Sequence, residues 1–302
     1  MRILANDGMD KKAAEALMAL GFEVDLNHYD GDKLFEQLKA VDCIIVRSAT
    51  KIRKVHIDAA KETGKLKLVV RAGVGIDNID HVYAKENGIS VRNTPNSSSD
   101  AVAELAIGHM FALARHIYIS NVTMREGKWN KKQYKGFELN GKTLGLVGFG
   151  RIAKSVAKKA MALGMNVIYN DLSSSIEGLE GCRYVEKETL LQEADIISLH
   201  IPFIKENGPY LDHAAFENMK KGMFIVHTAR GGVIDEDALL DALDKGIVER
   251  CALDVFEEEP VKNMRIYTHE KISLTPHIGT STIEAQSRIG QETIQVIKET
   301  LS

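Results

Sequence analysis

The sequence predicts an α/β protein made of two doubly wound parallel-sheet domains, and three observations support this prediction. Short β-rich runs alternate with amphipathic helical stretches from one end of the 302-residue chain to the other. A glycine-rich turn joins an apolar run to a helical pattern near the middle of the chain, at Gly148 and Gly150. A segment rich in turn formers and N-cap residues, 93–100, separates two series of such elements.

The first series consists of strands with helical stretches between them. The expected strands are Arg2–Ala5, Glu23–Leu26, Cys43–Val46, Leu68–Arg71 and Ile89–Arg92. A helix over Lys11–Leu20, closed by Gly21, exemplifies the helical stretches. A long helix is expected to start in segment 93–100 and to run to about Tyr118.

The second series begins just before the glycine-rich turn. The expected strands are Thr143–Val147, Asn166–Tyr169, Ile196–His200, Met223–His227, Glu249–Leu253 and Ile272–Leu274. The last helix is expected to start at a capping box, Ser281–Glu284, and to reach nearly to Leu301. We expect this helix to return to the N-terminal body and to pack on it.

The glycine-rich turn has the features of a dinucleotide-binding βαβ unit. Gly148 permits a tight turn, Gly150 lets the backbone approach a pyrophosphate, and Ala153 allows close packing of helix on strand. The N-terminus of the helix attracts the phosphates. Asp171 ends the next strand, where its carboxylate can bind ribose hydroxyls. We expect NAD rather than NADP, because Asp171 repels a 2′-phosphate and Leu172–Ser174 supply no cation.

The mid-chain position of this turn indicates two domains. The turn begins a nucleotide-binding domain, so the residues before it must form another body. We predict an NAD-binding Rossmann domain over residues 97–282 and a flavodoxin-like substrate-binding domain over residues 1–96 and 283–302. A hinge is expected near residues 95–100 and 278–283.

Composition excludes several classes of protein. A formal net charge of −3 gives no general attraction to nucleic acid or to an anionic membrane. Three scattered cysteines without CxxC spacing indicate a reducing compartment. The sequence contains neither an HExxH motif nor a cluster of Cys and His, so we expect no metal site. The N-terminus lacks an apolar signal region, and the longest apolar stretch is too short to span a bilayer. We expect a cytoplasmic protein with a small-molecule substrate.

Polar residues follow three successive strands of the second series. Arg230, Glu259 and His277 should converge, because strand ends in such a sheet meet at the ligand crevice. His277 titrates near neutral pH and suits proton exchange with a hydroxyl, and Glu259 would favour its protonated form. Arg230 would hold a substrate carboxylate, with Gly231 and Gly232 leaving room for close approach. This set suits hydride transfer to or from a carbon that bears a hydroxyl or carbonyl group, in a substrate with a carboxylate.

Other histidines have different expected roles. His200 is expected to line the adenine side of the cofactor, and His109 and His116 to serve packing or an interface on the long helix.

Longer motifs accompany these features, at residues 46–52, 71–80, 127–129 and 138–145. With them the chain resembles, over nearly its whole length, the D-isomer-specific 2-hydroxyacid dehydrogenase family, and most closely its D-3-phosphoglycerate dehydrogenase branch. The resemblance implies His277 as the acid–base residue, Glu259 as its partner and Arg230 as the carboxylate anchor.

The resemblance also implies contacts with cofactor and substrate. The implied cofactor-binding residues are Val74, Gly148, Gly150, Arg151, Ile152, Asp171, Ile201, Thr228, Ala229, Arg230, Asp254, His277 and Gly279. Of these, Asp254 is expected at the nicotinamide amide. Arg47 and Arg71 are the best candidates for binding a substrate phosphate, with Ser48 and Gln286 as donors and Gly75 closing over the substrate.

Three hypotheses about function follow. The first is NAD-dependent oxidation of 3-phospho-D-glycerate to 3-phosphooxypyruvate, in serine biosynthesis, by a homodimer that pairs through the long helix. The second keeps the chemistry with another substrate, such as glycerate, hydroxypyruvate, glyoxylate or a branched 2-hydroxy acid. The third is a non-catalytic NAD(H)-sensing interaction protein, against which the intact set of Arg230, Glu259 and His277 argues.

The sequence also departs from the family pattern. His227 stands where asparagine is common, and segment 204–211 lacks the usual threonine, which puts one cofactor contact in doubt. Because the sequence ends at Ser302, we expect no regulatory domain after the last helix and no serine inhibition through one.

Overall fold

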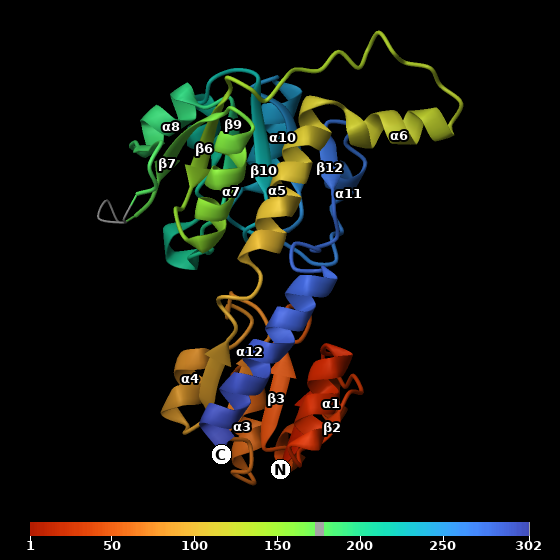
Figure 1. The fold of residues 1–302 in the computed structure, drawn as a ribbon, viewed down its shortest axis with the longest axis vertical. Coiled ribbons are helices and arrows are strands. Elements are labelled where there is room, and N and C mark those ends of the chain that lie inside the picture. The colour runs from red at the N-terminus through yellow and green to blue at the C-terminus, as the bar shows by residue number, and fades with distance from the viewer. Residues whose placement is uncertain (173–177, 302) are drawn as a thin grey trace. The chain divides into compact units, whose positions relative to one another are not determined.

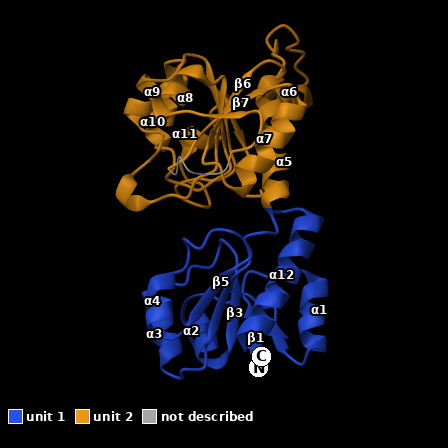
Figure 2. Ribbon diagram, turned by 60° about the vertical axis from the view of Figure 1, so that its left-hand side comes forward, with its two compact units in different colours: residues 1–98, 280–302 blue, residues 99–279 orange. Residues whose placement is uncertain are grey.

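The computed structural model describes residues 1–172 and 178–301, in two compact units (Figure 2). Unit 1 comprises Met1–Ser98 and Thr280–Ser302, and unit 2 comprises Ser99–Gly279. The divisions lie two residues after the predicted boundary at 96 and three residues before the one at 282. Both units are parallel α/β sheets, which confirms the predicted fold class.

Unit 1 contains a five-stranded parallel sheet in the order β2-β1-β3-β4-β5, the flavodoxin-like order (Figure 1). Its strands are β1 (Arg2–Ala5), β2 (Glu23–Asp25), β3 (Cys43–Val46), β4 (Leu68–Arg71) and β5 (Ser90–Asn93). Its helices are α1 (Lys11–Ala19), α2 (Gly31–Ala40), α3 (Lys54–Lys61), α4 (His81–Glu86) and α12 (Ile283–Leu301).

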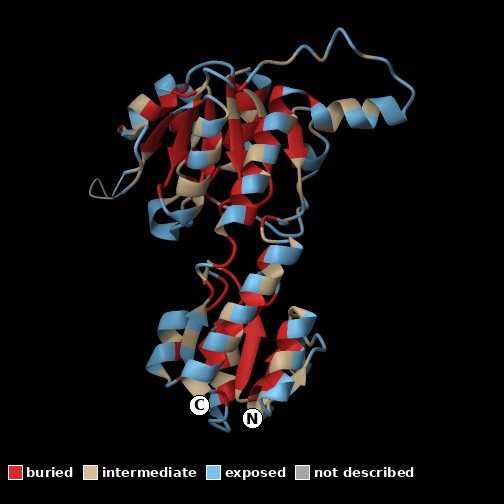
Figure 3. Cartoon of the chain, viewed as in Figure 1, coloured by how far each residue is buried: buried red, intermediate tan, exposed pale blue. Residues whose placement is uncertain are grey.

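Alternate residues of the unit 1 strands point to opposite faces, and both faces are covered by helices. Ile44 and Val69 pack with α2, α3 and α4, whereas Ile45 and Val70 pack with α1 and α12. The inner strands β3 and β4 are buried along their whole length, and Figure 3 shows buried strands at the centre of this unit. The final helix therefore packs on the N-terminal body, as the sequence predicted.

Unit 2 contains a seven-stranded parallel sheet in the order β12-β11-β10-β9-β6-β7-β8. Its strands are β6 (Thr143–Val147), β7 (Asn166–Asn170), β8 (Cys182–Tyr184), β9 (Ile196–Leu199), β10 (Met223–His227), β11 (Val248–Leu253) and β12 (Ile272–Leu274). Its helices are α5 (Ser99–Ala114), α6 (Ile117–Arg125), α7 (Arg151–Ala162), α8 (Lys187–Glu193), α9 (His213–Glu217), α10 (Glu236–Asp244) and α11 (Met264–Tyr267), with a 3₁₀ turn, Lys205–Asn207.

The order of unit 2 is that of a Rossmann sheet, in which the chain first builds one half outward from β6 and then the other half from β9. Helices α5 and α7 cover one face, and α8, α9, α10 and α11 cover the other. The switch in direction lies between β6 and β9, next to the glycine-rich turn.

Three local predictions need correction. The long helix ends at Ala114 rather than near Tyr118, because His116 takes a left-handed backbone conformation, with φ of 55°, and α6 starts after it. Helix α12 is capped by Thr282, whose Oγ1 accepts from the N–H of Ala285 at 3.1 Å, and not by the predicted Ser281 box. Strand β8 was not predicted, because three residues show too little alternation.

Among the described residues, no helix has both the length and the apolar character that crossing a membrane requires.

Candidate active site

Six strands of unit 2 end in one row along the carboxyl edge of the sheet. The final residues of adjacent strands are paired in register, from β12 to β7: Leu274, Leu253, His227, Leu199, Val147 and Asn170. The next residue of each strand therefore starts a loop at the same edge. These residues are Thr275, Asp254, Thr228, His200, Gly148 and Asp171. The edge thus carries both the predicted catalytic loops and the glycine-rich turn.

His277 and Glu259 form the central contact of this edge. Nδ1 of His277 lies 2.7 Å from Oε2 of Glu259, and both side chains are partly exposed. The backbone N–H of Phe256 donates to the other oxygen of Glu259 at 3.2 Å. A carboxylate on Nδ1 holds the proton there and directs Nε2 to the other side of the ring. The pair is arranged for proton transfer at Nε2.

The environment keeps Glu259 ionised. Burial raises the pKa of this carboxyl, but the hydrogen bond and charge of His277 outweigh burial, with help from the N–H of Phe256 and the charge of Arg230. The net pKa is lowered. Glu259 therefore stays a carboxylate that stabilises a positively charged His277.

Arg230 follows β10 on the neighbouring loop. One of its guanidinium nitrogens donates to the carbonyl of Ala229 at 2.7 Å. Its charge also lowers the pKa of Glu259, so these two side chains act on each other electrostatically. Arg230, Glu259 and His277 are thus brought to one edge of one sheet, on three successive strand ends.

The role predicted for Gly231 and Gly232 needs correction. A Cβ at Gly231 would lie 1.8 Å from the carbonyl oxygen of Phe256, and one at Gly232 would lie 3.0 Å from the ring of Phe203. The space beside these glycines is filled by neighbouring loops rather than left for a substrate. Their small size lets the loops after β10 and β11 pack together and holds Arg230 in place.

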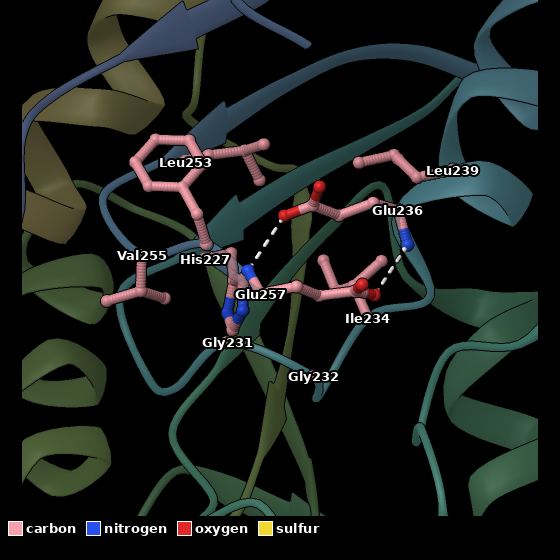
Figure 4. Close-up of a pocket in the computed structure, with 10 residues that line it drawn as sticks. His227, Gly231, Gly232, Ile234, Glu236, Leu239, Leu253, Val255 and Glu257 are labelled. Atoms are coloured by element: carbon pink, nitrogen blue, oxygen red, sulfur yellow. Dashed lines mark hydrogen bonds between the residues drawn. The ribbon is translucent and has the colours of Figure 1, made fainter. Parts of the chain in front are cut away.

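A small pocket lies between these two loops (Figure 4). Glu236 and Glu257 bridge it reciprocally: the N–H of each donates to a carboxylate oxygen of the other, at 3.2 and 2.9 Å. Its volume is about 10 Å³, which holds about one water molecule. This pocket therefore stiffens the loops, and it is too small for a hydroxy acid or a dinucleotide.

The edge at β6 and β7 fits a dinucleotide. Gly148 has φ of +82°, which the tight turn requires. A Cβ on Gly150 would meet nothing within 4 Å, so the backbone is open to a bulky group just before the N-terminus of α7. Asp171 accepts from the N–H of Phe149 at 2.7 Å, which places its carboxylate beside the turn. The N-terminal N–H groups of α7, from Arg151 onward, would hold the pyrophosphate.

Other predicted cofactor residues lie along the same edge. Thr228 is buried, and its hydroxyl has no hydrogen-bond partner among the described residues, so it can donate to a bound group. Ile201 packs beside Gly148, and Ala229 is buried next to Arg230. Of the residues that the NADP argument used, Ser173 and Ser174 lie outside the described residues.

Unit 1 holds the predicted substrate residues Arg47 and Ser48 on the loop after β3. The carboxylate of Asp7 accepts from the N–H of Arg47 at 2.6 Å and from that of Thr50 at 3.0 Å. The side-chain amide of Asn78 donates to the carbonyls of Arg47 and Thr50, each at 2.7 Å. Polar contacts on both sides therefore fix this loop.

Arg71 ends β4, paired in register with the last residue of β3. Its side chain is buried and covers Gly73, where a Cβ would lie 1.4 Å from the guanidinium. The neighbouring loop is held by Asn93, whose amide donates to the carbonyl of Val74, next to Gly75, at 2.5 Å. The remaining predicted residue of unit 1, Gln286, donates to the carbonyl of Thr280 at 2.8 Å.

One polar chain in unit 2 was not predicted from the sequence. His109, on α5, lies 3.1 Å from the hydroxyl of Thr275, which donates to Asp254 at 2.6 Å. Asp254 also accepts from the N–H groups of Ile278 and Gly279. The sequence suggested packing or an interface for His109, because a single histidine on an apolar helix face does not indicate its hydrogen-bond partner.

The described residues contain no group of three or more His, Cys, Asp or Glu side chains that could hold a metal ion.

A comparison with protein families identifies the chain. The model of the NAD-binding domain of D-isomer specific 2-hydroxyacid dehydrogenases matches residues 107–279. The chain belongs to this family. It is therefore an NAD-dependent oxidoreductase that acts on D-2-hydroxy acids, as the sequence predicted.

Individual relatives agree on the family and differ in substrate. The chain is 45% identical to hydroxypyruvate reductase of Thermotoga maritima, over 98% of this chain and 97% of the relative. It is 40% identical to D-3-phosphoglycerate dehydrogenase of Methanocaldococcus jannaschii, over the whole of this chain but only 57% of the relative. The chain spans about half the length of the phosphoglycerate dehydrogenases it matches.

Solved structures match the full length of this dehydrogenase. The TT0316 protein of Thermus thermophilus matches with a TM-score of 0.91 and 32% identity, over 100% of this chain and 97% of its own. A D-lactate dehydrogenase of Aquifex aeolicus, solved with NAD and lactic acid, matches with a TM-score of 0.86 and 29% identity, over 100% of this chain and 95% of its own.

The two glycine environments predict opposite outcomes for two matched substitutions. Gly150→Ala should change the free energy of unfolding by less than about 1 kcal/mol, because its Cβ enters open space, but should raise the Kd for NADH severalfold. Gly231→Ala should destabilise the protein by about 2 kcal/mol or more, because its Cβ overlaps a backbone oxygen. Urea unfolding and NADH fluorescence titration measure both. An unchanged Kd in Gly150→Ala contradicts a pyrophosphate at this turn.

Two desolvated histidines of the edge predict loss of stability in acid. Burial lowers the pKa of His200 and of His227 to about 3, from 6.5. As the pH falls, these histidines bind protons in the unfolded chain before they do so in the folded protein. Their contribution to stability is therefore complete above pH 6.5 and is lost as the pH falls toward 3. When the pH is lowered from 7 to 5, the free energy of unfolding should fall by about 2 kcal/mol less in His227→Asn than in the unsubstituted protein. Urea unfolding at both pH values checks this, and an identical loss in both proteins contradicts it.

Proposed function

We propose that this dehydrogenase oxidises 3-phospho-D-glycerate to 3-phosphooxypyruvate with NAD. The observation that carries the proposal is a pair of arginines in unit 1, additional to Arg230 of unit 2: Arg47 directly follows β3, and Arg71 ends the adjacent strand β4. A phosphorylated 2-hydroxy acid has two anionic groups, and an arginine fork suits each of them. The loop of Arg47 is held by Asp7 and Asn78, so its position is set before a substrate binds.

In the proposed mechanism, His277 and Arg230 act on two neighbouring groups of the substrate, the 2-hydroxyl and the carboxylate. Nε2 of His277 takes the proton of the 2-hydroxyl group, and the ionised Glu259 at Nδ1 stabilises the resulting imidazolium. Arg230 binds the carboxylate and orients the reacting carbon. NAD, when bound at the edge of β6 and β7, supplies the hydride acceptor.

The roles of the two domains form part of the same proposal. Residues 97–282 would bind NAD, with Asp254 at the nicotinamide amide, and residues 1–96 and 283–302 would bind the substrate. We also propose that the protein is a homodimer.

A second candidate is hydroxypyruvate reduction. It is favoured by the 45% identity to the Thermotoga maritima enzyme, which this chain matches over nearly the full length of both. The reverse of the proposed mechanism serves it: His277 gives a proton to the 2-oxo group, and Arg230 holds the carboxylate. This substrate has no phosphate and gives Arg47 and Arg71 nothing to bind.

A substrate panel decides between the two. Initial rates with NAD are compared for 3-phosphoglycerate and D-glycerate, and rates with NADH for 3-phosphooxypyruvate and hydroxypyruvate. We expect kcat/KM for the phosphorylated member of each pair to be at least about 100-fold higher, because a paired phosphate contributes about 3 kcal/mol. Equal or higher kcat/KM for hydroxypyruvate selects the second candidate. No turnover of any member supports a sensing protein.

Arg47→Ala should raise KM for 3-phosphoglycerate by about tenfold or more and change kcat less, because the phosphate is remote from the reacting carbon. KM for hydroxypyruvate should not change. The matched control is Lys67→Ala, which removes an exposed cation directly before β4, at the opposite end of that strand from Arg71. Steady-state kinetics check both. Equal effects of Arg47→Ala on both substrates would show that Arg47 does not bind phosphate.

His277→Ala should lower kcat by about 100-fold or more while Kd for NADH stays within about threefold, because the side chain moves the proton. Glu259→Gln should lower kcat less, since a neutral amide orients the ring without stabilising its charge. Stopped-flow turnover and NADH titration provide the measurements. Near-normal turnover of His277→Ala would refute the mechanism.

Asp171→Ala should narrow the preference for NAD over NADP by about tenfold or more, because it removes the charge that opposes a 2′-phosphate. The ratio of kcat/KM for the two cofactors measures this. Comparable use of both cofactors by the unsubstituted protein would contradict the assigned role of Asp171.

A further inference from the structure

The backbone at His277 is held in a conformation that its own residue type disfavours. His277 has φ of 53°, in the left-handed region, which costs a non-glycine residue about 1 kcal/mol or more. Within unit 2, His277 and His116 are the two described non-glycine residues with positive φ. Contacts elsewhere must therefore keep this loop in place if Nε2 is to stay where the proposed chemistry needs it.

The main contact is the carboxylate of Asp254, which is 1% exposed. It accepts from the N–H of Ile278 at 2.9 Å and from the N–H of Gly279 at 3.0 Å. These are the two residues directly after His277. A Cβ at Gly279 would lie 3.2 Å from the carboxylate, so the absence of a side chain allows this close approach. Asp254 thereby fixes the backbone that follows the catalytic histidine.

Thr275 ties the other end of the loop to the same carboxylate. Its hydroxyl lies 2.6 Å from Oδ1 of Asp254, and its carbonyl accepts from the N–H of His277 at 3.1 Å. A hydroxyl carries one proton and an ionised carboxylate only accepts, so Thr275 donates to Asp254. The oxygen of Thr275 must then accept from its second neighbour, Nε2 of His109, at 3.1 Å.

His109 is suited to this donor role. It lies on the buried side of α5, a helix that packs against α7 and against β10, β11 and β12. Burial lowers its pKa, although the charge of Asp254 acts in the opposite direction, so the ring is neutral at pH 7. A neutral ring has one N–H, and the contact with Thr275 places it on Nε2. The ring therefore gives the hydroxyl of Thr275 a single orientation.

We propose that His109 is a positioning residue for proton transfer, which orients Thr275 and, through Asp254, fixes the backbone on both sides of His277. It acts from a helix and touches none of the three predicted catalytic side chains. Its main effect should therefore appear in turnover. The proposal rests on His277 as the acid–base residue, which belongs to the proposed function.

Two variants of His109 separate the donor from the volume. His109→Leu replaces the ring with an apolar side chain of similar volume that has no N–H, whereas His109→Gln keeps an N–H donor at a similar reach. We expect His109→Leu to lower kcat by about tenfold while KM for the substrate stays within about twofold. His109→Gln should restore kcat to within about threefold of the unsubstituted protein. The proposal is overturned if kcat of His109→Leu equals that of the unsubstituted protein. It is also overturned if kcat of His109→Gln is as low as that of His109→Leu.

Thr275 provides an independent pair. Thr275→Val removes the hydroxyl at nearly constant shape, and Thr275→Ser keeps it. Thr275→Val should be as slow as His109→Leu, Thr275→Ser should be close to normal, and the double variant should be no slower than either single one. Fully multiplicative losses in the double variant overturn the proposal. If His109→Leu does not fold, the Thr275 pair and His109→Gln decide in the same way.

Hydrogen exchange gives a readout that does not depend on the substrate. Exchange of the amides of Ile278 and Gly279 should speed up by about tenfold in His109→Leu and Thr275→Val, and return toward normal in His109→Gln. Unchanged protection in both variants overturns the proposal. The two proposals can fail separately. If exchange speeds up in these variants but His277→Ala keeps its turnover, His277 is not the acid–base residue, whereas His109 and Thr275 still fix the loop.

Discussion

The register of the seven-stranded sheet is the constraint on which the site of this dehydrogenase depends. Hydrogen bonding between parallel strands pairs the last residues of six strands, so that six loops start in one row. The proposed catalytic and nucleotide-binding groups, from distant parts of unit 2, therefore meet at one edge of the sheet. A shift of one residue in β10, β11 or β12 would turn alternate side chains to the other face and separate Arg230, Glu259 and His277.

Close backbone packing turns this row of loops into a rigid site. Gly231 admits the carbonyl of Phe256, Gly148 admits that of His200, and Gly279 admits the carboxylate of Asp254. Each contact ties one loop to the loop that follows the adjacent strand of the sheet. Catalytic groups held in this way lose little conformational entropy when a substrate binds, which favours a pre-formed site over one assembled by the ligand.

The histidines of unit 2 show how environment decides the role of one residue type. His277 is partly exposed beside an ionised carboxylate, so it can carry charge during turnover. His200 and His227 lie at the ends of β9 and β10, where desolvation keeps them neutral. His109 is buried and neutral too, but its contact with Thr275 makes it a directed donor. Sequence position alone distinguished only the first of these.

The sequence by itself determined the fold class, the two series of strands, the cofactor and the reaction type. These follow from local information: the alternation of apolar runs and helices, the glycine turn with Asp171 after it, and the polar residues after strands. The tertiary structure alone decided that Gly231 serves loop packing, that the long helix breaks at His116, and that His109 reaches Thr275. These depend on contacts between residues far apart in the chain, which no local pattern encodes.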